Sequence, residues 1–377
     1  MAGIYIHIPF CKQACHYCDF HFSTSLKKKE EMLAAIQKEL FLRKDELAGE
    51  HIETIYFGGG TPSILAVEEI NTLIDTVYQQ YTVVHQPEIT LEANPDDLDS
   101  ATIQRLAQSK VNRLSIGIQS FGEEDLKMMN RAHNAQEAIS CLQEVVKYFD
   151  NISIDLIYGI PNLSNERWID NIQRILDLGI SHISCYALTV EERTALNKLI
   201  QKGVIPSPKE EVAHAHFMLL IEKLRANGYI HYELSNFAKP GYYSKNNSAY
   251  WLGKKYLGIG PSAHSFDGRY RSWNISNNPL YIKAIEAGEL PSEIEELSVV
   301  DRYNEYVMTG LRTIWGVDLT RVSNEFGAEF YNYLIQESAS FIVDGFMQKQ
   351  ENILTITDKG KFLSDGIASD LFWLDLN

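Results

Sequence analysis

The sequence predicts an α/β protein: an incomplete (β/α)6 barrel of TIM-like type, followed by a C-terminal α+β unit of winged-helix-like type. Two observations support this fold class. Short apolar segments alternate with amphipathic helical segments between residues 4 and 188, which is the pattern of a parallel sheet covered by helices. Several predicted strands also have one apolar and one polar face, as in a barrel whose polar face lines the interior.

The predicted elements follow one another in a regular order. Strands are expected at residues 4–10, 54–59, 88–94, 113–119, 152–159 and 182–188. Helices are expected between them at 28–44, 66–81, 100–109, 135–149 and 165–178. Beyond about residue 191 the alternation ends, and the expected elements are helices at 208–227, 300–312 and 318–326 and a strand pair near 346–356.

These patterns divide the chain into three expected regions. Residues 1–200 form the partial barrel, and residues 201–297 form an extension and connecting region that carries the sequence NNSAYW. Residues 298–377 form a C-terminal accessory domain. A chain of 377 residues with 45% hydrophobic residues is long enough to bury more than one core.

Charge and hydropathy exclude several classes of protein. No segment approaches the roughly 20 apolar residues of a membrane span, and the N-terminus lacks the pattern of a signal peptide. A cytoplasmic location is therefore expected. The formal net charge is −16, and the only basic run is Lys27–Lys29, which has the pattern of a solvated helix face. We expect no binding to nucleic acid, because that function usually requires a basic surface.

Polar side chains recur on the interior face of successive predicted strands. A barrel places them around one lumen, with the chemistry at the carboxyl ends of the strands. A structural layer of mutually paired polar groups is the alternative. The residues on this face are Thr90, Glu92, Asn94, Ser115, Gly117, Gln119, Ser153 and Asp155.

Three of the five cysteines, Cys11, Cys15 and Cys18, lie within eight residues directly after the first predicted strand. A cubane iron-sulfur cluster normally takes four thiolates, so three leave one iron open, and an open position is typical of a catalytic metal centre. Zinc held by the three cysteines and His16 is the rival. The remaining cysteines, at positions 141 and 185, are expected to be buried apolar thiols rather than a fourth ligand.

The spacing Cys-x3-Cys-x2-Cys after the first strand, with Tyr17 just before Cys18, resembles the radical S-adenosylmethionine (SAM) superfamily. The resemblance implies a radical SAM barrel in which the three cysteines hold a 4Fe-4S cluster. It also implies that the amino and carboxylate groups of SAM chelate the fourth iron. Electron transfer from the reduced cluster would then cleave SAM to methionine and a 5'-deoxyadenosyl radical.

The same resemblance implies a set of SAM contacts. Gly59, Gly60 and Thr61, in the GGGTPS sequence that ends the second strand, would hold the methionine amino group. Arg131 suits the SAM carboxylate, because a guanidinium pairs well with a carboxylate. Tyr5 and Tyr17 would flank the cluster. The remaining implied contacts are Glu92, Gln119, Asp155 and, near the adenine, Ala187.

Further phrases resemble one branch of the superfamily, which holds the oxygen-independent coproporphyrinogen III oxidases and the HemW heme chaperones. These phrases are QSF, NRAH, DLIYGIP, YLGIGPSAHSF and SVVDRYNEYVMTGLR. Two features favour the chaperones. The oxidases carry a further cysteine where this chain has Phe20, and they have a long arm before the first strand, whereas here Met1 stands three residues before it.

The heme-associated motif of the chaperones is His-Asn-x-x-Tyr-Trp. Asn247, Tyr250 and Trp251 match it, but Asn246 stands at the histidine position. A neutral carboxamide is a poor donor to heme iron compared with an imidazole, which places heme ligation at Asn246 in doubt. His264 is a candidate substitute.

The sequence as a whole predicts a heme chaperone that binds a 4Fe-4S cluster, SAM and heme, and passes heme to an unknown acceptor protein. Two alternatives stay open: a coproporphyrinogen III oxidase acting by radical decarboxylation, and a zinc-stabilised binding module. A monomer or a homodimer is expected. Peripheral contact with a membrane-bound partner is left open.

Overall fold

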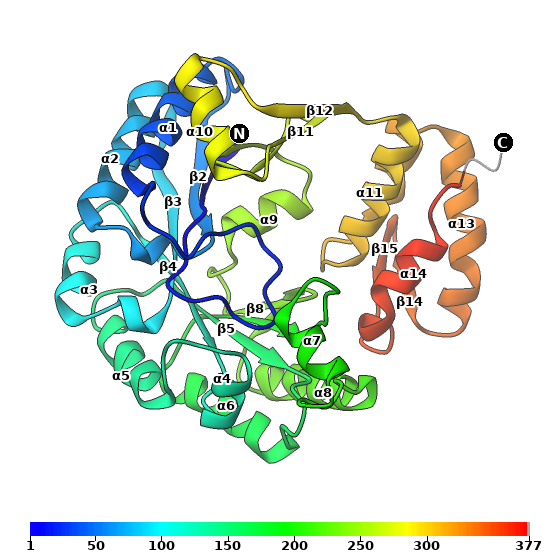
Figure 1. Cartoon of the computed structure of the whole chain (residues 1–377). Coiled ribbons are helices and arrows are strands. Elements are labelled where there is room, and N and C mark those ends of the chain that lie inside the picture. Colours follow the sequence, from blue (N-terminus) through cyan, green and yellow to red (C-terminus); the bar gives the residue numbers. More distant parts are fainter. Residues whose placement is uncertain (375–377) are drawn as a thin grey trace.

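The structure is a computed structural model and describes residues 1–374; it contains one large sheet and one small one. The large sheet has 12 strands in the order β12-β11-β10-β9-β1-β2-β3-β4-β5-β6-β8-β7. Strands β1 to β6 are neighbours in chain order and run parallel, and β9 adds to the β1 side, also in parallel. The sheet curves without closing, so the predicted incomplete barrel is confirmed (Figure 1).

The barrel strands and the helices between them follow the predicted order, with one additional short helix at Glu123–Met128 that was not predicted. The strands are β1 (Ala2–Ile8), β2 (Ile52–Gly59), β3 (Val83–Ala93), β4 (Arg113–Gln119), β5 (Ile152–Tyr158) and β6 (His182–Ala187). The outer helices are α1 (Lys29–Leu42), α2 (Val67–Gln80), α3 (Ser100–Ala107), α4 (Glu123–Met128), α5 (Ala135–Val145) and α6 (Asn165–Asp177). The helices lie around the outside of the curved sheet (Figure 1).

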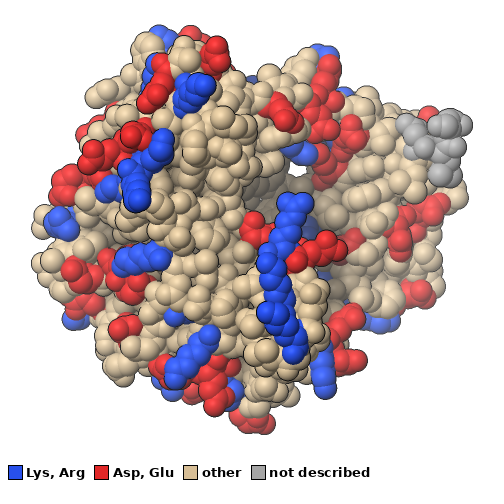
Figure 2. Space-filling view, viewed as in Figure 1, with Lys and Arg blue, Asp and Glu red and all other residues tan. Residues whose placement is uncertain are grey.

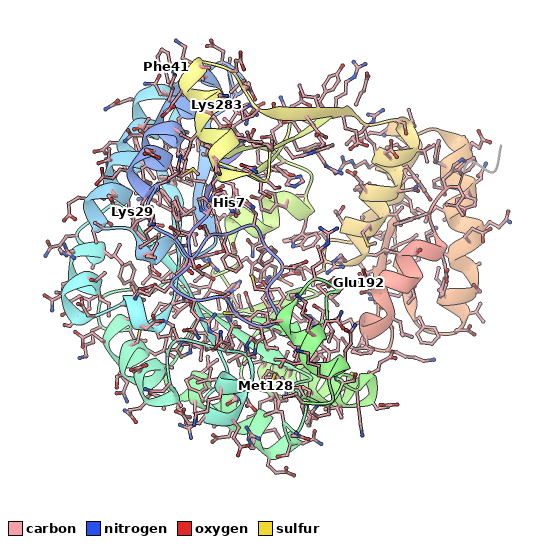
Figure 3. All side chains as sticks on the ribbon, viewed as in Figure 1. His7, Lys29, Phe41, Met128, Glu192 and Lys283 are labelled. Atoms are coloured by element: carbon pink, nitrogen blue, oxygen red, sulfur yellow. The ribbon has the colours of Figure 1, made fainter. Side chains whose placement is uncertain are left out.

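Alternation along the strands decides which side chains reach the interior. In β1, Ile4, Ile6 and Ile8 are fully buried in the hydrophobic core, whereas Tyr5 and His7 point to the opposite side. Figure 3 shows His7 toward the inside of the barrel, and Lys29 of α1 on its outer side. The polar face of the strands therefore lines the lumen, as the alternation predicts.

Residues beyond the sixth strand extend the sheet at both of its edges. The elements on the β6 side are α7 (Ala195–Gln201), α8 (Glu210–Ala226), β7 (Ile230–Glu233) and β8 (Asn236–Ala238). The elements on the β1 side are α9 (Lys245–Trp251), β9 (Lys255–Ile259), β10 (His264–Phe266), β11 (Tyr270–Asn274), α10 (Asn278–Ala287) and β12 (Ser292–Glu296). Short 3-10 turns occur at Pro62–Ile64 and Pro95–Asp97. Strands β7, β8 and β10 to β12 pair antiparallel.

The C-terminal unit is a winged helix, as predicted. Its elements run α11 (Val299–Leu311), β13 (Val317–Asp318), α12 (Leu319–Glu325), α13 (Ala328–Val343), β14 (Met347–Gln350), β15 (Ile353–Ile356), a 3-10 turn (Lys361–Leu363) and α14 (Ser364–Asp370). The small sheet has the order β13-β15-β14. The expected pattern lacked helices α13 and α14, whose side chains Leu334 and Ile367 are buried in the hydrophobic core of this unit.

Two buried clusters of side chains correspond to the barrel and the winged helix. The two units meet where the segment after α11 pairs with edge strand β7. The Leu234 amide donates to the Arg312 carbonyl oxygen over 2.9 Å, and the Ile314 amide donates to the Tyr232 carbonyl oxygen over 3.0 Å. Figure 2 shows the surface hollowed between the two units, and acidic and basic side chains mixed over the face in view.

No helix within residues 1–374 is both long enough and apolar enough to cross a membrane.

Candidate functional site

A cavity of about 440 Å³ opens at the carboxyl ends of the parallel strands. The loop after β1, the end of β2 and the ends of β3 to β6 all contribute to it, as expected for a barrel of this type. The predicted residues that line this cavity are Cys11, Cys15, Tyr17, Cys18, Gly59, Gly60, Thr61, Glu92, Gln119, Arg131, Asp155 and Ala187.

The three clustered cysteines lie on the loop that follows β1, and each of their side chains is a free thiol. The Thr61 hydroxyl lies 3.3 Å from the Cys11 sulfur, and an Arg131 nitrogen lies 3.4 Å from the Cys15 sulfur. Burial raises the pKa of Cys11, and it raises the pKa of Cys18 to about 11. A raised pKa favours the neutral thiol. Bound iron would instead favour the thiolate, because a metal ion deprotonates a coordinating thiol.

Backbone hydrogen bonds fix the cysteine loop in place. The Cys11 amide donates to Ser23 over 3.0 Å, and the His16 amide donates to Met129 over 3.0 Å. The His16 ring also places Nδ1 2.8 Å from the Met128 carbonyl oxygen, which engages that nitrogen. Within residues 1–374, no group of three histidine, cysteine or acidic side chains surrounds a single point where one metal ion would sit.

The glycines of the second strand allow its end to approach the cysteine loop. The Gly60 amide donates to the Ile8 carbonyl oxygen over 2.9 Å, and the Thr61 amide donates to the Phe10 carbonyl oxygen over 2.7 Å. A Cβ atom on Gly60 would lie only 2.5 Å from the same Phe10 oxygen. Only glycine therefore permits this contact, and the loop and the strand form one wall of the cavity.

Arg131 joins the cysteine loop to two barrel strands. One terminal nitrogen donates to Asn94 Oδ1 and to the Gly117 carbonyl oxygen, each over 2.7 Å. The other lies near the Cys15 sulfur and 3.5 Å from the Tyr17 hydroxyl. The Nε of Arg131 is buried and has no hydrogen-bond partner among the described residues. The guanidinium thus combines positive charge with an unused donor, a combination that suits a carboxylate.

Two carboxyl groups, one on β3 and one on β5, also line the cavity. The Tyr56 hydroxyl donates to Glu92 over 2.7 Å, and the Ser115 hydroxyl donates to Asp155 over 3.3 Å. Burial raises the pKa of Glu92 to about 7 and that of Asp155 to about 6. Carboxyl groups with raised pKa values in a cavity commonly bind or react with a ligand, because a ligand cation or donor would favour their charged form.

Some cavity residues were not expected, and one expected residue lies elsewhere. Tyr186 lines the mouth of the cavity and is 46% exposed, and it was not among the residues expected from the sequence. The alternation of β6 could have identified it, because Tyr186 follows Cys185 and therefore points to the interior face of the strand. Gln119 ends β4 with a φ of 67°, a backbone conformation that is uncommon for a residue other than glycine. Tyr5 lies outside the cavity lining, where it stacks on Tyr56 at 6.0 Å and contacts the His7 ring.

The residues of the NNSAYW segment lie away from the cysteine cavity, on helix α9. Asn246 is 3% exposed, and its Oδ1 accepts a hydrogen bond of 3.0 Å from Thr54. The Asn247 amide donates to the Ser244 hydroxyl, which caps the helix. Packing therefore holds the side chain at position 246 inside the protein.

Tyr250, Trp251 and His264 also lie outside the cysteine cavity. Tyr250 meets Tyr256 edge-on at 4.6 Å, and Trp251 packs under the Arg312 guanidinium at 5.2 Å. Tyr250 and Trp251 line a separate cavity of about 330 Å³ between the barrel and the winged helix. His264 is exposed at the start of β10, beside Trp273.

Comparison with known proteins identifies the family. A model of the radical SAM superfamily matches residues 5–175, and a model of the HemN C-terminal domain matches residues 297–363. The heme chaperone HemW of Bacillus subtilis is 32% identical over 97% of this chain and 98% of its own length. The chain belongs to the HemW family of radical SAM proteins.

Other HemW proteins match to a similar extent. The HemW of Lactococcus lactis is 32% identical over 99% of this chain and 98% of its own length. The HemW of Mycobacterium tuberculosis is 30% identical over 98% of this chain and 94% of its own length. The solved structure of coproporphyrinogen III oxidase (HemN) from Escherichia coli has a TM-score of 0.85. The match covers 98% of this chain and 90% of the HemN chain. Because the two sequences are only 23% identical, the match supports the fold and not the function. The predicted resemblance to the HemW branch is confirmed.

Proposed function

We propose that this protein is a heme chaperone that holds a 4Fe-4S cluster on Cys11, Cys15 and Cys18, binds SAM in the adjoining cavity and transfers heme to an acceptor protein. The observation that carries this proposal is the meeting of three free thiols, the close-packed glycine strand and Arg131 in one cavity of a HemW-family barrel. When bound, a reduced cluster supplies an electron for the cleavage of SAM.

Each side of the cavity suits a different part of SAM. Arg131 would orient the carboxylate through its unused Nε donor. The end of the second strand, at Gly59, Gly60 and Thr61, would receive the amino group through backbone carbonyl oxygens. Glu92 and Asp155 would accept hydrogen bonds from the amino and ribose groups, since carboxylate oxygens are acceptors. Gln119, Tyr17 and Ala187 complete the proposed contacts.

Partner, location and domain limits are further parts of the proposal. The acceptor is a heme-binding protein, and the chain acts in the cytoplasm as a monomer or homodimer, with peripheral contact to a membrane-bound acceptor left open. We propose no nucleic-acid partner, because the net charge is −16. The proposed regions are residues 1–200, 201–297 and 298–377.

Metal analysis of anaerobically reconstituted protein tests the cluster. We expect about four iron atoms per chain in the wild type and in Cys141→Ala, and a loss of most iron in Cys15→Ala. Cys141 is the matched control because it is a buried free thiol on α5, away from the cavity. A wild-type protein that holds one zinc ion and no sulfide would contradict the proposal.

A transfer assay tests the chaperone activity. Heme-loaded protein is mixed with apomyoglobin as a generic acceptor, and the appearance of the myoglobin Soret band is followed against free hemin. Coproporphyrinogen III, SAM and a reductant are supplied in a parallel reaction. Heme transfer without formation of protoporphyrinogen is expected; the reverse outcome would make the protein a coproporphyrinogen oxidase.

A further inference from the structure

A cavity of about 550 Å³ lies at the opposite end of the barrel from the cysteines. It is bounded by the first residues of β3, by one face of α9 and by the segment that follows α11. His85 near the start of β3 lines this cavity, whereas Glu92 near the end of the same strand lines the cysteine cavity. Seven residues of strand separate the two by roughly 20 Å, so they are distinct sites.

We infer that this cavity binds the heme cargo, with His85 as the ligand of the heme iron. The inference rests on the proposed heme chaperone function. His85 is exposed, and its ring makes no hydrogen bond within residues 1–374. Its nitrogens are therefore free to coordinate, and a histidine imidazole is a common axial ligand of heme iron. The side chain of Asn246, by contrast, is held in the interior by Thr54.

The walls of the cavity suit a flat, largely apolar ring. Tyr243 and Trp315 stand edge to face with their ring centres 6.4 Å apart. The α9 face presents the small residues Ser248 and Ala249 and the exposed Leu252, which is 43% accessible. Half-buried aromatic rings and an exposed aliphatic side chain in a concave site indicate a ligand with an apolar body.

The charges around the cavity suit the two carboxylates of heme. Lys245 is exposed and forms no ion pair within the described residues, and Lys254 pairs with Glu53 over 2.8 Å. Two lysines against one glutamate leave the lining with a charge of +1, in a chain whose net charge is −16. The Ser248 hydroxyl is buried without a partner among the described residues and supplies a further donor. A locally basic site in an acidic protein favours an anionic ligand.

The cavity between the barrel and the winged helix suits heme less well. Its lining contains no histidine, cysteine or methionine, so the donors to iron would be the phenols of Tyr250, Tyr256 and Tyr306 and two glutamates that already form ion pairs. Burial raises the pKa of all three, which disfavours the phenolate needed for coordination. Two of its three arginines already pair with glutamates, at 2.6 and 2.9 Å.

A fourth cavity, of about 420 Å³, contains His231 but has no aromatic wall. The lining is mostly threonine, glutamine and charged residues. The His231 ring is stacked on Phe237 at 4.0 Å, and its Nε2 donates to the Leu234 carbonyl oxygen over 3.0 Å. A buried imidazole ring held in this way is not available to coordinate the iron of a heme in this cavity.

Hemin titration of the full-length, cluster-reconstituted protein tests the inference. We expect His85→Ala to weaken binding at least tenfold and to change the Soret band. His214→Ala, which removes another exposed histidine, on α8 outside the cavity, should titrate like the wild type. Added imidazole should restore the wild-type spectrum of His85→Ala, because it replaces the missing ligand; a merely structural role of His85 would not produce this rescue. Lys245→Gln should weaken binding severalfold without changing the band position.

The possible results separate the inference from the proposed function. If the wild type binds heme and His85→Ala titrates with the same affinity and spectrum, the inference is wrong while the chaperone proposal stands. If Tyr256→Phe rather than His85→Ala removes the Soret band, the heme lies at the winged helix and the inference is also overturned. If the wild type binds no heme, both fail.

Discussion

At the scale of single residues, Glu92 illustrates how the cavity balances stability against binding. Burial raises the pKa of its carboxyl group to about 7, above the 4.5 of an unburied glutamate. The native state therefore holds a proton that the unfolded chain releases between about pH 4.5 and 7. The stability that this proton contributes is fully present below pH 4.5 and is lost as the pH rises through 7.

We predict that Glu92→Gln raises the free energy of unfolding of the ligand-free protein, by about 2 kcal/mol more at pH 8.5 than at pH 5.5. The amide needs no ionisation, so it avoids the cost of burying a charge. SAM affinity should fall at least tenfold, because a charged acceptor is lost. Urea unfolding at both pH values and calorimetric titration with SAM measure the two effects.

Glu295→Gln is the matched control, since Glu295 is exposed on β12. It should change stability by less than about 0.5 kcal/mol at either pH. A Glu92→Gln variant that is less stable at pH 8.5 would show that the carboxylate is paired rather than strained in the native protein.

At the scale of elements, helix α9 depends on a residue from a distant strand. The Lys245 and Asn246 amides donate to the two carboxylate oxygens of Glu88, each over 3.0 Å. Glu88 lies on β3 and is 5% exposed. An acidic group at this position satisfies two amides that the helix cannot pair internally and interacts favourably with the helix dipole.

Removal of that carboxylate should loosen α9. We predict that Glu88→Ala lowers the free energy of unfolding by about 2 kcal/mol. Hydrogen exchange of the α9 amides should accelerate more than that of the neighbouring strands. Glu53→Ala removes the β2 partner of the half-exposed ion pair with Lys254, and it should lower the free energy of unfolding by less than about 1 kcal/mol. Unchanged exchange in α9 of Glu88→Ala would show that packing alone holds the helix.

The elements that the sequence predicted are those with a clear local period. In α6, Trp168, Ile172 and Ile175 recur at helical spacing and are fully buried, and the predicted helix is confirmed. Helix α9 has no such period: its sequence KNNSAYW is rich in polar residues and follows a glycine- and tyrosine-rich stretch. Its helical form depends on caps from Ser244 and from Glu88, and the second of these is 157 residues away from Lys245.

At the scale of the whole molecule, the winged helix and the barrel have separate cores joined by an edge pairing. We predict that Ile314→Pro weakens this junction, because proline lacks the amide that donates to Tyr232. Small-angle scattering should show a larger radius of gyration, and proteolysis should cut the connecting region faster. SAM binding should stay within twofold of the wild type, since the cysteine cavity lies within the barrel.

Ile314→Ala is the control for this junction, because it removes the exposed side chain and keeps the amide. It should retain the wild-type scattering profile and protease resistance. Equal behaviour of the two variants would show that contacts other than the β7 pairing hold the two units together.

Local patterns in the sequence determined the barrel order, the polar lumen face and the cysteine loop, because alternation and spacing involve residues close together in the chain. The meeting of Cys11, Thr61 and Arg131 in one cavity followed from the barrel topology, which brings the ends of parallel strands together.

The tertiary structure alone decided the burial of Asn246 and the cavity that joins His85 to Trp315. These depend on where a late segment of the chain packs against an early one. The energy of such contacts arises only when the distant surfaces are in place. The sequence around Asn246 or His85 therefore does not indicate which distant residues it will contact.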